Sequence, residues 1–241
     1  MLYVVCCLLL KEHALEYTRA LELKGRFVLI IWPEHCLVGS RGQKVVPSLA
    51  SALQEWCEYN NTSRSVEYLQ KGLNNLTEMY SAIAADVPLD SDPSTHINRP
   101  FLARLNQSQK LYICGQALSH CVNFTMRDVL ANWPREHKNL HLLEDCCSAV
   151  PGFEESATSF VVDMRQAGCT VTTSEVPLSP SNYGLLIIDP QVDFHPGGSL
   201  AIPTADSDSM RTAAFIRANI SSIDRIFVTL DTHNVSVAYM N

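Results

Sequence analysis

The chain has 241 residues, of which 46% are hydrophobic and 18% are charged. This is a globular composition, and it excludes a largely disordered protein. A net charge of −7 with only 18 Lys and Arg residues disfavours a nucleic-acid binder and a protein of anionic membranes.

The sequence favours a cytoplasmic protein. No apolar run reaches the roughly 18 residues that a membrane span requires. The apolar stretch 1–10 lacks a basic region and a small-residue cleavage site, so it gives little support for a signal peptide. Nine cysteines, an odd number with no C-x-x-C pair, favour a reducing compartment.

Short β-rich runs alternate along the chain with longer segments of helical periodicity. The expected strands are 26–32, 65–70, 110–114, 140–144, 170–173, 184–189 and 225–230. Most are continuous apolar runs, which is typical of parallel strands buried on both faces. Helical spacing is clear over 14–23, 122–133 and 153–164. This alternation predicts an α/β fold with a mostly parallel sheet.

One segment, 176–182, is rich in proline and small polar residues and breaks both periodicities. It separates a longer part, 11–175, from a shorter part, 183–241, which holds only two strands and one helix. That is too little for an independent doubly wound core. We therefore expect the second part to pack on the first part or on another chain.

The turn 115–122 follows the strand 110–114 and opens a helix, and it carries Cys121. A cysteine at such a turn meets unpaired backbone N–H groups and the positive end of the helix dipole. Both stabilise a thiolate and could hold an oxyanion. Cys121 is therefore a candidate nucleophile, and a buried structural cysteine is the alternative.

Two charged residues lie at the ends of other predicted strands. Asp189 ends the apolar strand 184–189, where a partly buried carboxylate could act as a general base or could simply cap a turn. Lys71 follows the strand 65–70, and alone it would be interpreted as a surface residue.

Three residues of metal-binding type also follow predicted strands. Asp231 and His233 end the strand 225–230 on the same side of the chain, so both can point at one metal ion. His35 follows the strand 26–32 and offers a third ligand. Because all these groups lie at the carboxyl ends of strands, the sequence favours an enzyme over a binding scaffold.

Six spaced motifs resemble those of the isochorismatase-like cysteine hydrolase superfamily, with the nicotinamidase branch nearest. They are Ile187–Phe194 with Pro196–Leu200, Leu230–His233, Trp32–Gly39, Lys71–Gly72, Tyr80–Ser81 and Gly115–Val122. The resemblance covers nearly the whole chain from about residue 11. It implies a doubly wound, Rossmann-like three-layer sandwich with helices on both faces of a mostly parallel sheet.

The resemblance also implies catalytic roles. Cys121 would be the nucleophile, Asp189 the base that takes its proton, and Lys71 the cation that completes the triad. Backbone N–H groups of Ala117 and Cys121 would form the oxyanion hole, with a cis peptide before Ala117.

The binding roles follow from the same resemblance. Asp231, His233 and His35 would bind a divalent ion, for which two imidazoles and one carboxylate suit Zn, Fe or Mn. Phe194 and Trp32 match the aromatic residues that flank a pyridine ring in nicotinamidases.

The order of the motifs differs from that of the family, because the segments of Asp189 and Asp231 follow that of Cys121. A circular permutation, a truncated head-to-tail duplication and a wrongly joined gene model would each produce this order. Our interpretation is a single permuted domain, 11–241. In it, 11–175 is the family's C-terminal part, 176–182 is a linker, 183–241 is the family's N-terminal part, and 1–10 is unassigned.

The resemblance implies a cysteine-dependent amidohydrolase that releases ammonia from a small amide through a thioester. Nicotinamide, converted to nicotinate in NAD salvage, is the best single substrate. The alternatives are hydrolysis of another amide or carbamoyl compound, an inactive binding protein, and a redox-active thiol protein. Val192 and the long interval from Lys71 to Ser81 depart from compact nicotinamidases, so cysteine hydrolase is better supported than nicotinamidase. A homo-oligomer is compatible with the small second part.

Overall fold

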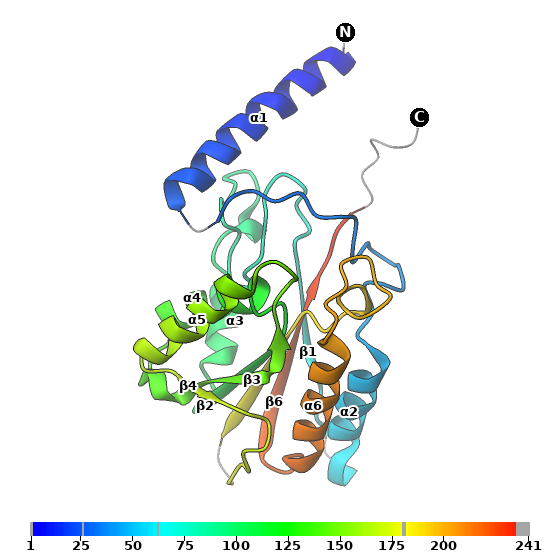
Figure 1. Ribbon diagram of the computed structural model, residues 1–241, viewed down its shortest axis with the longest axis vertical. Coiled ribbons are helices and arrows are strands. Elements are labelled where there is room, and N and C mark those ends of the chain that lie inside the picture. Colours follow the sequence, from blue (N-terminus) through cyan, green and yellow to red (C-terminus); the bar gives the residue numbers. More distant parts are fainter. Residues whose placement is uncertain (1, 26, 62, 180–181, 235–241) are drawn as a thin grey trace.

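Six parallel strands form the middle layer of the molecule (Figure 1). The computed structural model describes residues 2–25, 27–61, 63–179 and 182–234. The strands are β1 (Glu67–Lys71), β2 (Lys110–Gln116), β3 (Leu140–Ser148), β4 (Thr170–Thr172), β5 (Tyr183–Ile188) and β6 (Ile223–Asp231), and their order across the sheet is β1-β6-β5-β2-β3-β4. The predicted α/β fold with a parallel sheet is confirmed.

The central strands are the most apolar ones. Every residue of β5 is buried, and six of the seven residues of β2 are buried as well. A strand in the middle of a parallel sheet is covered on both faces, which is why its sequence is a continuous apolar run.

One predicted strand is wrong. Residues 27–32 of the expected strand 26–32 form no strand, and Arg26 lies outside the described residues. The segment runs as extended chain near the carboxyl ends of the strands, with Val28 80% and Ile31 92% exposed. A β-prone run becomes a strand only when it pairs with a neighbouring strand, and among the described residues no strand of the sheet pairs with this segment.

Helices cover both faces of the sheet. The helices α3 (Arg99–Leu105), α4 (Cys121–Ala131) and α5 (Glu154–Gln166) lie on one face, and α2 (Pro47–Glu58) and α6 (Ala205–Ala218) lie on the other (Figure 1). Each presents an apolar stripe to the sheet, as an amphipathic helix must. Within the described residues, no helix is both long and apolar enough to cross a membrane.

The first helix, α1 (Leu2–Lys24), lies apart from these layers, beyond the carboxyl ends of the strands (Figure 1). Its C-terminal half packs on the rest of the chain through Tyr17 and Leu21, which are buried. It ends at Gly25, whose φ of 62° is left-handed and suits glycine.

The strand order has a simple form when the strands are counted from β5. Counting β5, β6, β1, β2, β3 and β4 in turn gives the spatial order 3-2-1-4-5-6, the usual order of a doubly wound sheet. The predicted linker 176–182 leads into β5 and is anchored to the end of α6, since the N–H of Leu178 donates to Asn219 Oδ1 at 2.9 Å. The late strand β5 thus occupies the centre of the sheet.

Candidate functional site

The carboxyl ends of four strands supply the candidate site. Lys71 is the last residue of β1 and is paired in register with Asp231, the last residue of β6. Asp189 follows β5 directly, and Cys121 is the first residue of α4, after β2. In the doubly wound order, β5 and β2 flank the point where the strand order reverses. A crevice at this point is where open α/β sheets bind their ligands.

The Lys71 ammonium lies at the centre of the site. Its Nζ is 2.9 Å from Asp189 Oδ2 and 3.5 Å from Cys121 Sγ. It also lies 3.2 Å from Asp231 Oδ1 and donates to the carbonyl of Met79 at 3.1 Å. The structure therefore brings together the thiol, the carboxylate and the ammonium that the sequence placed on different strands.

Burial and these contacts together set the charges of the three groups. Burial alone would lower the pKa of Lys71, but the carboxylates of Asp189 and Asp231 raise it well above its usual value. Burial raises the pKa of Asp189 and of Cys121, and Lys71 opposes both increases. The resting site thus holds the charged ammonium of Lys71, the protonated thiol of Cys121 and the Asp189 carboxyl group, whose proton affinity is increased. A carboxylate of increased proton affinity is suited to act as the base for that thiol.

Asp189 is fixed by its neighbour on β6. The Thr229 hydroxyl donates to Asp189 Oδ1 at 2.6 Å, and the N–H of Asp189 donates to the Thr229 carbonyl at 3.1 Å. Its φ of 46° lies in the left-handed region, which is uncommon for a residue other than glycine. With Oδ1 held by Thr229, Oδ2 is directed to Lys71.

The turn between β2 and α4 has the features of an oxyanion hole. The peptide between Gln116 and Ala117 is cis. In the described part of the chain, the N–H groups of Ala117 and Cys121 donate to no backbone carbonyl. They lie at the N-terminus of α4, whose dipole favours negative charge.

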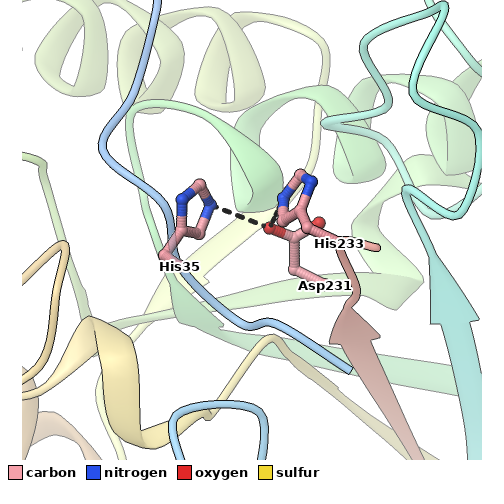
Figure 2. Close-up of side chains that lie close together, drawn as sticks. All are labelled: His35, Asp231 and His233. Carbon is pink, nitrogen blue, oxygen red and sulfur yellow. Dashed lines mark hydrogen bonds and ion pairs between the residues drawn. The ribbon is translucent and has the colours of Figure 1, made fainter. Parts of the chain in front are cut away.

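Two imidazoles meet on one carboxylate oxygen of Asp231 (Figure 2). Asp231 Oδ2 lies 3.1 Å from His35 Nε2 and 2.9 Å from His233 Nε2. Candidate ligand atoms of the three residues all fall within 4.8 Å of one another. The sequence predicted these three residues as a metal site, and the structure brings them together.

The hydrogen bonds of His35 suit a metal ligand. Its Nδ1 lies 2.7 Å from the carbonyl of Pro33, which can only accept, so Nδ1 carries a proton. In neutral His35 the Nε2 lone pair then faces the Asp231 carboxylate, and a proton or a cation is needed between them. Second-shell carbonyls commonly orient metal-binding imidazoles in this way. The donor set of two imidazoles and one carboxylate therefore fits a divalent ion.

A half-buried carboxylate, that of Asp193, braces the two histidine segments. Asp193 Oδ2 accepts from the N–H of Cys36, the residue after His35, at 2.7 Å. The carbonyl of Cys36 in turn accepts from the N–H of His233 at 3.2 Å. Asp193 belongs to the motif Ile187–Phe194, but no role was assigned to it from the sequence. A hydrogen bond between residues 157 positions apart leaves no local signal in the sequence.

Aromatic side chains line the pocket above Cys121. Trp32 donates from Nε1 to the Tyr80 hydroxyl at 2.8 Å and contacts the ring of His120 at 5.2 Å. Phe194 lines the same pocket and lies 5.5 Å from the His35 ring. Trp32 and Phe194, which the sequence placed beside the substrate, are thus both in the pocket.

Two polar residues of this pocket were not identified from the sequence. His120 precedes the cysteine, and burial lowers its pKa to about 4, so its imidazole is neutral at pH 7. Glu78 lies in the loop after β1, where burial and the charge of Asp231 raise its pKa. His120 could have been identified by its place next to Cys121, whereas the irregular loop of Glu78 offers no periodic signal.

Comparisons with known proteins give one distant relationship. No protein-family model matches the chain. The nicotinamidase of Escherichia coli strain K12 is 24% identical over 162 residues, which are 67% of this chain and 66% of that protein. The chain thus spans about two thirds of the length of the relative it matches. A solved nicotinamidase pyrazinamidase from Acinetobacter baumannii is 19% identical with a TM-score of 0.43, and the match covers 60% of this chain and 59% of that one.

Proposed function

We propose that this chain, a distant homologue of the nicotinamidases in the isochorismatase-like superfamily, is a cysteine amidohydrolase that releases ammonia from a small amide. One observation carries the proposal: Lys71 Nζ lies within 3.5 Å of Cys121 Sγ and within 2.9 Å of Asp189 Oδ2. A thiol, a base and an orienting cation in mutual contact are the requirements for a nucleophilic cysteine.

The first half of the reaction forms a thioester. Asp189 takes the thiol proton of Cys121, and the resulting thiolate attacks the amide carbonyl carbon. Negative charge then develops on the carbonyl oxygen, where the N–H groups of Ala117 and Cys121 can receive it; losing one such donor typically costs about 3 kcal/mol. Asp189 returns the proton to the amide nitrogen, the C–N bond breaks, and ammonia leaves.

The second half hydrolyses the thioester. Asp189 takes a proton from water, the hydroxide oxygen bonds to the acyl carbon, and the C–S bond breaks. The sulfur leaves as a thiolate next to Lys71, and the Asp189 proton restores the thiol. The product is a carboxylic acid, and Lys71 remains charged throughout because the Asp231 carboxylate, 3.2 Å from its Nζ, takes no part in the proton transfers.

A divalent ion fits the site of Asp231, His35 and His233. When bound, such an ion supplies a Lewis acid that can anchor and orient a substrate nitrogen. Replacing His35 and His233 by alanine should abolish stoichiometric metal in the purified protein, measured by elemental analysis. Full retention of metal in the double variant would contradict the ligand assignment.

Nicotinamide is the first substrate to test, because Phe194 and Trp32 line the pocket and the matched relative is a nicotinamidase. The assay is ammonia release by the purified protein, with Cys121→Ala as the matched control. Activity that disappears in the variant supports the proposed nucleophile. Equal release by both proteins contradicts it, and no release from any amide would favour an inactive binding protein.

We also propose that the domain is a circularly permuted member of its superfamily, folded within one chain. Support comes from the spatial order 3-2-1-4-5-6 when strands are counted from β5, and from the contact of Lys71 and Cys121 of the first part with Asp189 of the second.

Mixing two inactive variants tests this organisation. Cys121→Ala and Asp189→Asn proteins, refolded together, should stay inactive if each site forms within one chain. Recovery of activity in the mixture would show that the site forms between chains.

A further inference from the structure

The pocket that contains Cys121 is small. Its cavity measures about 30 Å³ and is enclosed by Trp32, Tyr80, Phe194 and the catalytic groups. A water molecule needs roughly 10–15 Å³ of such space, so the cavity holds about two or three waters. That is room for a carboxamide group of three heavy atoms, and the remainder of a substrate must lie elsewhere.

Two larger cavities adjoin this inner pocket. One, of about 330 Å³, lies between 29–37 and the loop after β1; it shares Trp32, His35 and Glu78 with the inner pocket. The other, of about 340 Å³, lies between α1 and the same loop. The two cavities have Leu29, Asn75, Glu78 and His233 in common, so they lie side by side, and we call the pair the outer cleft.

The outer cleft has the size and continuity of a binding site. Each of its two cavities falls within the 300–1,000 Å³ usual for small-molecule pockets. Glu78 lines all three cavities, so the inner pocket and both parts of the cleft adjoin one another at this side chain. A substrate whose carboxamide reaches Cys121 can therefore extend past Trp32 and Glu78 into the cleft.

The lining of the outer cleft indicates what it accepts. Leu29, Ile30 and Ile31 offer apolar contacts, and Glu34 and Glu78 carry the acidic groups. Among the described residues that line the two cavities, none is Lys or Arg. Beyond His35 and His233, which are assigned to the divalent ion, a negatively charged extension would meet Glu34 and Glu78 with no Lys or Arg to pair with it and is disfavoured.

We propose that the outer cleft binds the non-reacting part of an elongated primary carboxamide, whose extension is partly apolar and carries no negative charge. This inference rests on the proposed amidohydrolase function and names its substrate class. Compact amides such as nicotinamide would be accepted more weakly, because they leave the cleft unfilled.

Protection of Cys121 from iodoacetamide tests the proposal without requiring turnover. The reagent forms an S–C bond with the thiolate and releases iodide, and mass spectrometry locates the modified peptide. Heptanamide and 6-aminohexanamide should protect Cys121 at concentrations at least about tenfold lower than nicotinamide, since their chains add buried methylenes. Adipamate, which has a similar length and a terminal carboxylate, should protect less well than either.

A variant that fills the cleft completes the test. Asn75→Trp should reduce the advantage of heptanamide over nicotinamide at least about fivefold, whereas Gln54→Trp, on the exposed face of α2, should leave that ratio unchanged. Equal protection by nicotinamide and heptanamide, better protection by adipamate, or no effect of Asn75→Trp would overturn the proposal. Protection in the expected order with no ammonia from any amide would instead refute the hydrolase function alone.

Discussion

Lys71→Met is the sharpest test of the charge arrangement in the site. The side chain is fully enclosed, with 1% exposure, and methionine fills nearly the same space without charge. The substitution removes the ammonium that lies 2.9 Å from Asp189 and 3.2 Å from Asp231. Two buried carboxylates then remain without their shared counterion.

The expected loss of stability is large. Removing one partner of a buried ion pair typically costs about 3–5 kcal/mol, because an uncompensated charge stays in the interior. For a chain of this size, each kcal/mol lowers the melting temperature by about 2–4 °C, so we expect a decrease of roughly 6–20 °C at pH 7.5.

The deficit should shrink in acid. Burial raises the pKa of Asp189 while Lys71 lowers it, so removing Lys71 raises this pKa further. A carboxyl group whose pKa is higher in the folded than in the unfolded state destabilises the protein as pH rises through the folded-state pKa. Below the unfolded-state pKa it has no such effect. Burial would raise the pKa of Asp231, but Lys71 helps to keep it well below its usual value of 3.8, so this contribution is lost only as pH falls below that value and is present at both pH 4.5 and pH 7.5. The two proteins should therefore differ less at pH 4.5 than at pH 7.5.

Thermal and urea unfolding at both pH values measure the effect, with Lys44→Met as the control. Lys44 is exposed, and its replacement removes the same charge, so it should change stability by less than about 0.5 kcal/mol. If both variants lose the same stability, or if the Lys71→Met deficit grows in acid, the reasoning about the buried carboxylates is refuted.

Three further predictions concern the parts that hold the site together. Gly115→Ala should destabilise the fold by about 3 kcal/mol or more in urea unfolding, since its Cβ would lie 2.0 Å from the Ile188 carbonyl oxygen. Gly152→Ala, which shares a positive φ but meets open space, should cost much less. Asp193→Ala should weaken Zn²⁺ binding about tenfold in a chelator competition, because Cys36 loses its acceptor; unchanged affinity would rule out the brace. Tyr17→Phe removes the acceptor of the Glu78 N–H and should speed exchange of that amide hydrogen about fivefold, with no such change expected for Thr18→Val.

The sequence predicted the strand-end residues well, for a physical reason. Parallel strands bring their carboxyl ends to one edge, so Lys71, Asp189 and Asp231 could be placed together once their strands were recognised. The segment 27–32 shows the limit of the same logic. Its composition is that of a strand, but whether a β-prone run pairs depends on a neighbour that no local pattern reveals.

The supporting contacts were beyond the reach of pattern reasoning. The bond from Cys36 to Asp193 and the approach of Tyr17 to Glu78 join residues far apart in the sequence. Glu78 lies in a loop, where side-chain direction follows from packing and not from a period of 2 or 3.6 residues. Sequence therefore identifies the chemical groups of the site, and the tertiary structure determines what holds them.

The position of β5 and β6 has a consequence for synthesis on the ribosome. β1 has β6 as its sheet neighbour, and roughly 150 residues separate the end of β1 from the start of β6. At about 5–20 residues per second, the nascent chain carries β1 without that neighbour for about 8–30 s. β2 likewise lacks its partner on one side until β5 emerges. The central strands β5 and β6 are synthesised last, so the earlier strands expose apolar faces and unpaired edges during translation. A chaperone that shields strand edges would have most to protect in this period.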